Sequence, residues 1–248
     1  MTPSNAATEA PGASATALGV RRSAERGYFD HGWLRTYHSF SFADYDDPQW
    51  LGYGPLRVIN DDRVAAGQGF GKHGHRDMEI LTYILSGELA HRDSLGNGSV
   101  IRVGDVQRMS AGTGVTHSEF NPSAAQEVHL LQIWILPDAL RLAPGYEQRA
   151  FGAAEKRGRL RLIASRAGED GALTIHQDAR VYAGLFDGAE HAEISVESGR
   201  RLWLQMARGQ LAIGTTALSG GDGAYLAGPA QLSLHGGTDA EVLVFDLP

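Results

Sequence analysis

The stretch MEILTYILSGELAHRDSLGNGSVIRV, residues 78–103, decides the fold class of this chain. It reads as a strand, a glycine turn at residues 86–87, a second strand, and a hairpin at Asn97-Gly98. Asn-Gly between two strand-like runs is the strongest short-range signal of a β-hairpin. Further along, VHLLQIWIL (128–136) is an apolar run rich in β-forming residues, typical of a buried strand. Because helical periodicity is scarce elsewhere, we predict an all-β protein with few short helices.

Two parts of this region recur later in the chain, in the same order. SGELA (86–90) is echoed by RGQLA (208–212), and GDVQRM (104–109) is echoed by GDGAYL (221–226). A repeat of this kind indicates duplication of one structural unit. The sequence therefore predicts two homologous β-barrels in tandem, divided near residue 140.

Composition limits the classes of function. The chain has 248 residues, a formal net charge of −7 and no cysteine, which excludes disulfides, iron–sulfur clusters and thiol catalysis. Its 32 glycines are about twice the usual share of ~7%, as many tight turns require. An acidic chain without a Lys/Arg cluster is not expected to bind nucleic acid directly, and no apolar run is long enough to span a membrane. Residues 1–17 are small and polar, so we expect a disordered lead and a cytoplasmic protein.

Two short segments flanking the opening stretch carry metal-ligating side chains. In the first, a regular strand would place His73, His75 and Glu79 on one face, together with Asp77. In the second, TGVTHSEFNPS (113–123), the alternating residues are His117, Glu119 and Asn121. If neighbouring strands carry the two segments, three imidazoles and a carboxylate converge, a donor set that suits Fe(II), Mn(II), Ni(II), Cu(II) or Zn(II).

The alternative is that these histidines only share a polar turn, since a surface histidine is far commoner than a metal ligand. The joint pattern of two segments favours the metal site. We interpret His91 as support for a turn. The remaining histidines are interpreted as structural or surface residues: His31, His38, His129, His176, His191 and His235.

The spacing G-x5-H-x-H-x3-E, from Gly67 to Glu79, followed by His117-x3-Asn121, resembles the two motifs of the cupin superfamily. The second motif departs from that pattern, because Ser110 stands where cupins often have proline. The similarity is closer to the pirin family: HGHRDMEILTYILSGELAHRDSLGNG, GDVQRMSAGTGVTHSEFNPS and QIWILP resemble its bacterial, quercetinase-type members. It covers nearly all of the chain after the lead.

The resemblance implies a bicupin with jelly-roll barrels, in which the first barrel, residues 18–140, binds one metal ion. Iron(II) is the first expectation, with Mn, Ni, Co, Cu or Zn as alternatives. The second barrel, residues 141–248, has no His-x-His at the equivalent positions and is expected to bind none. Spacing alone does not choose between Glu79 and Glu119 as the fourth ligand. The pirin resemblance implies the set His73, His75, His117 and Glu119.

Four further residues are candidates around this set. Glu79 could orient one of the histidines, or it could line the barrel and hydrogen-bond to backbone. Phe70, Met109 and Phe120 flank the ligands and could wall a pocket, although plain core positions explain them equally well.

By the same resemblance, we expect a dioxygenase that cleaves a flavonol such as quercetin with O2, a quercetin 2,3-dioxygenase-like enzyme with Glu119 as catalytic base. The alternative is a metal- or redox-responsive regulatory module that acts through a protein partner, which an acidic surface suits better than DNA. A sugar or small-acid isomerase is a weaker third reading, because one fold hosts several chemistries. We expect a monomer.

Overall fold

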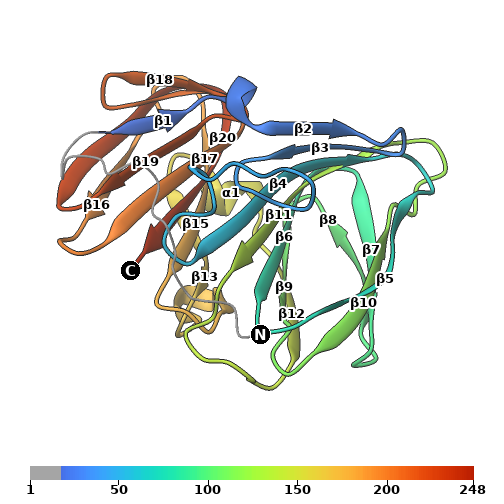
Figure 1. The fold of residues 1–248 in the computed structure, drawn as a ribbon. Helices are drawn as coiled ribbons and strands as arrows, with labels where there is room; N and C mark the ends of the chain where they lie inside the picture. Colours follow the sequence, from blue (N-terminus) through green and yellow to red (C-terminus); the bar gives the residue numbers. More distant parts are fainter. Residues whose placement is uncertain (1–17) are drawn as a thin grey trace.

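The structure, a computed structural model, describes residues 18–248 (Figure 1). It is built almost wholly of strands, arranged in two halves that lie side by side. This confirms the prediction of an all-β bicupin with few short helices. The predicted lead, residues 1–17, lies outside the described residues. The described helices are α1 (Ala153–Lys156) and the 3-10 turns η1 (Ser23–Glu25) and η2 (Glu169–Gly171).

The first half is a barrel made of two sheets that face each other. A four-stranded sheet has the order β5-β10-β7-β8, and a seven-stranded sheet has the order β12-β9-β6-β11-β4-β3-β2. The four-stranded sheet comprises β5 (Gly69–His75), β10 (Val115–Phe120), β7 (Glu88–Asp93) and β8 (Gly98–Arg102). The seven-stranded sheet comprises β12 (Gly145–Ala150), β9 (Asp105–Ser110), β6 (Glu79–Ser86), β11 (Val128–Ile135), β4 (Leu56–Val64), β3 (Leu34–His38) and β2 (Gly27–Asp30).

The second half is one nine-stranded sheet that curls around its own apolar core. Its path runs β1-β19-β17-β20-β15-β13-β14, with β16 added to β20 and β18 added to β17. The strands are β1 (Gly19–Arg21), β13 (Leu160–Ser165), β14 (Leu173–Thr174), β15 (Arg180–Phe186), β16 (Ala192–Val196), β17 (Arg201–Ile213), β18 (Thr216–Ser219), β19 (Gly223–Ala227) and β20 (Ala230–Leu247).

The opening stretch folds as its pattern predicts. Strands β6, β7 and β8 follow one another, and Gly87 makes the first turn with a φ of +75°. A β-carbon at Gly87 would lie 3.0 Å from the Glu127 carbonyl oxygen, so both the backbone angle and the space favour glycine. Strand β6 is almost continuously buried because the seven-stranded sheet is covered on both faces.

The two halves share one apolar core. It includes Leu81 and Ile133 on the outer face of the seven-stranded sheet, and Trp203 and Phe245 from the second half. Each part of the chain also contributes a strand to the other half: β1, near the start, pairs with β19, and β12, which follows residue 140, pairs with β9. The division between residues 140 and 141 stays a prediction. No helix within residues 18–248 is long and apolar enough to cross a membrane.

Candidate metal centre

Three of the predicted ligands meet on the inner face of the four-stranded sheet. Strands β5 and β10 are antiparallel neighbours, and the register places His117 opposite His73 and Val115 opposite His75. Because alternate residues share a face, all three imidazoles project into the first barrel. The Nε2 atoms of His117 and His73 lie 3.0 Å apart, and ring centroids within the three-histidine group are separated by 4.4–4.8 Å. One ligand atom from each of the three histidines lies within 4.8 Å of the others.

These imidazoles are ready to bind a cation at neutral pH. Burial, followed by the neighbouring His73, lowers the pKa of His75 to about 4. Burial and the other histidines lower the pKa of His117 to about 3. A metal therefore does not compete with a proton for either ring near pH 7. The donor set fits a divalent transition metal ion, for which imidazole is a preferred ligand.

Glu119 lies deeper in the barrel than this group. A register shift between His117 and Glu119 marks a β-bulge, and the carboxylate of Glu119 forms a second close group with His91 and His117. Its Oε2 accepts a hydrogen bond from Gln132 Nε2 at 3.1 Å, whereas its Oε1 is buried and has no hydrogen-bond partner among the described residues. Burial and the nearby charge of Asp62 raise the pKa of Glu119 to about 7. An unpartnered buried oxygen is available to a cation or to a proton.

His91 occupies a position that its sequence neighbours do not indicate. It contacts Asp93 of the turn, as expected for turn support, but in β7 it is also 1% exposed and its Nδ1 lies 3.5 Å from Nδ1 of His117. Its Nε2 lies 3.3 Å from Oδ2 of Asp93. The contacts from Asp93 through His91 thus end at Nδ1 of His117, whereas Nε2 of the same ring faces His73. Contacts of this kind fix the orientation and tautomer of a ligating imidazole.

We predict that His91→Ala weakens metal binding about 10–100-fold without abolishing it, the usual effect of removing such an orienting partner. Chelator competition on the purified variant measures the change. His191→Ala, at an exposed site in the second half, is the control and should bind as the wild type does. Complete loss of metal in His91→Ala would instead make His91 a ligand, in the group with His117 and Glu119.

A second buried carboxylate faces Glu119 from β4. Asp62 is 4% exposed, and burial raises its pKa to about 7, with the nearby Thr36 hydroxyl opposing this and the charge of Asp61 adding to it. In the unfolded chain the same group titrates near 3.8. Between these values the folded state holds more protons, so stability falls as pH rises from about 4 to about 7.

Asp62→Asn should therefore flatten this part of the stability curve and stabilise the metal-free protein above pH 7, by roughly 4 kcal/mol at most. Urea unfolding of both proteins at pH 5 and pH 8, with a chelator present, measures the difference. An equal loss of stability in the two proteins between these pH values would contradict the assignment.

The structure does not place Glu79 beside the three histidines predicted as ligands. It begins β6 on the face turned toward the second half, where Ser110 Oγ donates to its Oε2 at 2.8 Å and His176 Nδ1 lies 3.1 Å from its Oε1. His176 comes from the second half, so this buried carboxylate links the two halves. The histidine that Glu79 contacts is not one of the predicted ligands.

The three residues predicted to wall a pocket lie in different environments. Phe70 pairs with Glu119 across the strands and packs on Trp33, and Met109 is buried with Ile80. Phe120 is 43% exposed, because it alternates with Glu119 and points away from the barrel interior.

Trp134, in the run predicted to be a buried strand, packs against the buried Ile80 and Met109 group and also lies against the histidine cluster. Its ring centroid is 4.9 Å from that of His75 and 5.3 Å from that of Phe42, and its Nε1 is buried without a hydrogen-bond partner among the described residues. An aromatic wall with an unused N–H donor thus stands beside the imidazoles. The sequence shows a tryptophan in this strand, but it does not indicate that the ring would face His75.

The fold and this site define a two-domain cupin protein with a histidine cluster suited to a divalent metal ion. The pirin profile matches residues 19–135, and the profile of the quercetinase C-terminal cupin domain matches residues 162–247. A protein named quercetin 2,3-dioxygenase from Escherichia coli (strain K12) is 45% identical over 229 residues, covering 92% of this chain and 98% of that protein. The chain belongs to the pirin family.

Solved structures agree with this assignment. YhhW from Escherichia coli superposes with a TM-score of 0.90 at 44% identity, covering 94% of this chain and 98% of that one. A structure of bacterial pirin YhhW in complex with nickel(II) superposes with a TM-score of 0.89, also at 44% identity, covering 94% and 99% of the two chains. That related protein therefore binds a divalent transition metal.

Proposed function

We propose that this protein is a metal-dependent dioxygenase that cleaves a flavonol such as quercetin with O2. The observation that carries the proposal is the cluster of three imidazoles beside a buried carboxylate and an aromatic wall. The related protein named quercetin 2,3-dioxygenase, at 45% identity over most of both chains, supports the same activity.

In this proposal His73, His75, His117 and Glu119 hold the ion. A bound divalent metal supplies Lewis acidity, which favours the ionised form of a coordinated hydroxyl group. We propose iron(II) as the native metal on the family resemblance, although imidazole and carboxylate donors accept several metals.

The remaining steps fall to this chain's own side chains. Glu119 has a pKa of about 7, so it exchanges a proton readily near neutral pH and can accept the proton of a flavonol hydroxyl at its unpartnered Oε1. Trp134 offers a flat surface for the flavonol rings and an N–H donor for one of their oxygens. The second half covers the outer face of the seven-stranded sheet and so holds the barrel in shape.

Oxygen uptake tests the proposal. Protein reconstituted with Fe, Mn, Ni, Co or Cu and mixed with quercetin in air should consume O2 with at least one of these metals, and should release carbon monoxide. Absence of turnover with all five metals would reject the proposed activity.

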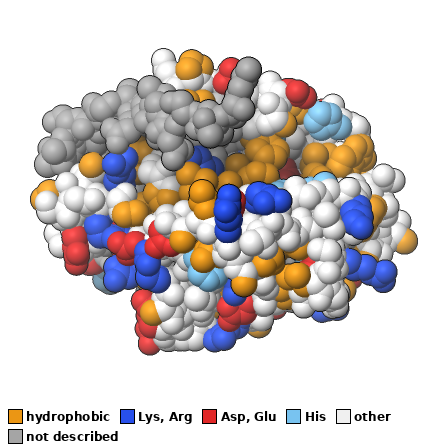
Figure 2. All heavy atoms as spheres, turned by 60° about the horizontal axis from the view of Figure 1, so that its bottom comes forward, with side chains coloured by type: hydrophobic (Ala, Val, Ile, Leu, Met, Phe, Trp, Pro, Cys, Tyr) orange, Lys and Arg blue, Asp and Glu red, His pale blue; other side chains and the backbone are white. Residues whose placement is uncertain are grey.

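The other expectations stay predictions: a monomer, a cytoplasmic location, and action through a protein partner as the alternative role. On the described part of the face shown in Figure 2, basic and acidic side chains are interspersed rather than gathered into one basic patch.

A further inference from the structure

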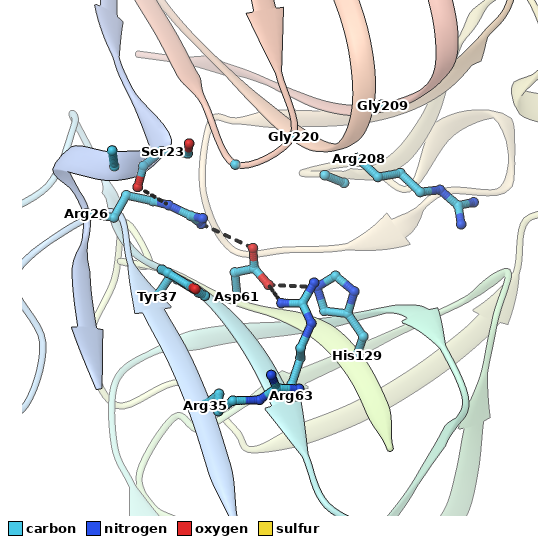
Figure 3. Close-up of a pocket in the computed structure, with 13 residues that line it drawn as sticks. Ser23, Arg26, Arg35, Tyr37, Asp61, Arg63, His129, Arg208, Gly209 and Gly220 are labelled. Carbon is cyan, nitrogen blue, oxygen red and sulfur yellow. Dashed lines mark hydrogen bonds and ion pairs between the residues drawn. The ribbon is translucent and has the colours of Figure 1, made fainter. Parts of the chain in front are cut away.

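A cavity of about 600 Å³ lies between the two halves (Figure 3). Strands β3, β4 and β11 line it from the first half, and β17 with the turn at residues 220–221 lines it from the second. It occupies the outer face of the seven-stranded sheet. Asp61 and Arg63 of β4 face this cavity, whereas Asp62 between them is directed into the barrel and lies near Glu119. The cavity is therefore separate from the metal centre.

The floor of the cavity is one carboxylate surrounded by nitrogen donors. Asp61 lies 3.2 Å from Arg26 Nη1, 3.2 Å from Arg63 Nη1 and 2.6 Å from His129 Nε2. The Asp61 side chain is 8% exposed, and Arg26 is held further by the ring of Tyr37, 4.7 Å away. Asp61 thus fixes the directions of the arginines more than it neutralises them. We call this site the arginine cleft, defined by Arg26, Arg35, Arg63, Arg208, Asp61 and His129.

The opposite wall contributes Arg208 from β17. Its Nη2 lies 2.6 Å from Glu241 Oε2, but that buried carboxylate is shared, because Lys156 Nζ lies 3.3 Å from Oε1 and the Tyr83 hydroxyl donates to Oε1 at 2.5 Å. The Arg208 side chain remains 51% exposed. Figure 3 shows it above His129, with its guanidinium extending away from Asp61.

The rim carries two partly exposed guanidiniums, those of Arg35 and of Arg63, which also contacts Asp61. Arg35 Nη2 lies 2.7 Å from Glu127 Oε2, and Arg63 Nε lies 3.9 Å from Oε1 of the same carboxylate. The exposed fractions of the two arginine side chains are 48% and 32%. Counting the lining side chains with their ion-pair partners, four guanidinium groups face three carboxylates, a local positive excess of one charge in a chain of net charge −7.

Apart from Arg208, the residues of the second half that line the cavity are small. Gly209 has a φ of +72°, and a β-carbon there would lie 2.2 Å from the Asp239 carbonyl oxygen. Register shifts in β17 on both sides of Arg208 mark bulges. Bulges re-aim a side chain, and here they flank Arg208 where it lines the cavity. The wall continues with Ala207 and Gly220, which leave room for a ligand between the halves.

We propose that the arginine cleft binds a small oxyanion ligand, carrying carboxylate or phosphate groups. Guanidinium groups present paired N–H donors whose spacing matches carboxylate and phosphate oxygens. A cleft with a positive excess and low-dielectric walls also concentrates anions. The ligand would contact both halves, through Arg63 on one side and Arg208 on the other.

Titration calorimetry with inorganic phosphate and with succinate tests this on the metal-loaded protein. At least one anion should bind saturably and more weakly as NaCl is raised. Arg208→Ala and Arg63→Ala should each weaken binding about tenfold or more, the effect of losing a charged hydrogen bond. Arg102→Ala, which removes a 64% exposed arginine paired with Glu88 in the first barrel, is the matched control and should bind normally.

The same titrations on His75→Ala separate this site from the metal centre. Affinity that persists in His75→Ala supports the cleft, and tighter binding of phosphate or of succinate tells which class of ligand the cleft prefers. The proposal is overturned if neither anion binds saturably, if both cleft variants keep wild-type affinity, or if His75→Ala abolishes binding. Melting temperatures of the variants without ligand show that each is folded.

Discussion

Replacing His75 by alanine is expected to remove both the bound metal and the flavonol turnover. His75 is one of three imidazoles whose ligand atoms lie within 4.8 Å of one another, and its lowered pKa of about 4 leaves its lone pair free near pH 7. Without it, two imidazoles and Glu119 remain. We expect metal affinity to fall by more than the roughly 10–100-fold loss typical of residues that only orient a ligand.

Elemental analysis and O2 uptake on the same preparation measure both effects. His191→Ala is the control, an exposed histidine of the second half that should retain full metal and full turnover. A His75→Ala protein that still holds one equivalent of metal at wild-type affinity would contradict the three-histidine centre. In that case the group of His91, His117 and Glu119 would be the better candidate.

The meeting of the three histidines was predictable because it depends on local rules. Alternation along a strand sets the faces of His73 and His75, and antiparallel pairing of β5 with β10 brings His117 opposite His73. These rules need only that the two segments be neighbouring strands. The overall duplication was predictable for a similar reason, since each half repeats the glycine-turn pattern in the same order.

Glu79 shows where strand alternation fails. The spacing from His75 suggests a shared face, but β5 ends at His75 and β6 begins at Glu79 in the other sheet. Between them Asp77 has a φ of +50°, in the left-handed region that breaks an extended strand. A turn between two residues removes any fixed relation between their faces, so spacing alone could not place this carboxylate.

His91 and the arginine cleft were missed because they depend on tertiary contacts. His91 lies opposite Glu119 only through the pairing of β7 with β10, 26 residues apart from His117 along the chain. The cleft joins Arg26 and Arg63 to Arg208 across the two halves. No local pattern relates such distant arginines. The sequence holds a weak signal for His91 alone. His91 and Asp93 alternate on a predicted strand, as a histidine and its orienting carboxylate would.

Glu119→Gln should separate metal binding from proton transfer. Glutamine keeps the size of the side chain and an oxygen that can face the ion, and Gln132 can still hydrogen-bond to it, but an amide does not accept a proton near neutral pH. We therefore expect most of the metal to remain while turnover falls by about 10²–10⁴-fold, the range for loss of a general base.

The pH profile sharpens this expectation. A base works when ionised, so wild-type kcat/KM should rise with pH through the pKa of Glu119. Burial places that pKa at about 7 in the metal-free protein, and a nearby cation favours the carboxylate, which moves the rising limb below 7 in the loaded enzyme. The limb should be absent in Glu119→Gln.

Glu79→Gln is the matched control for this prediction. Glu79 is also a buried glutamate of the first half, but Ser110 and His176 hold it on the opposite face of β6 from the barrel interior. Its replacement should leave the pH profile and the metal content unchanged. If Glu119→Gln loses metal as completely as His75→Ala, or keeps the rising limb, Glu119 is not the base and another group accepts the proton.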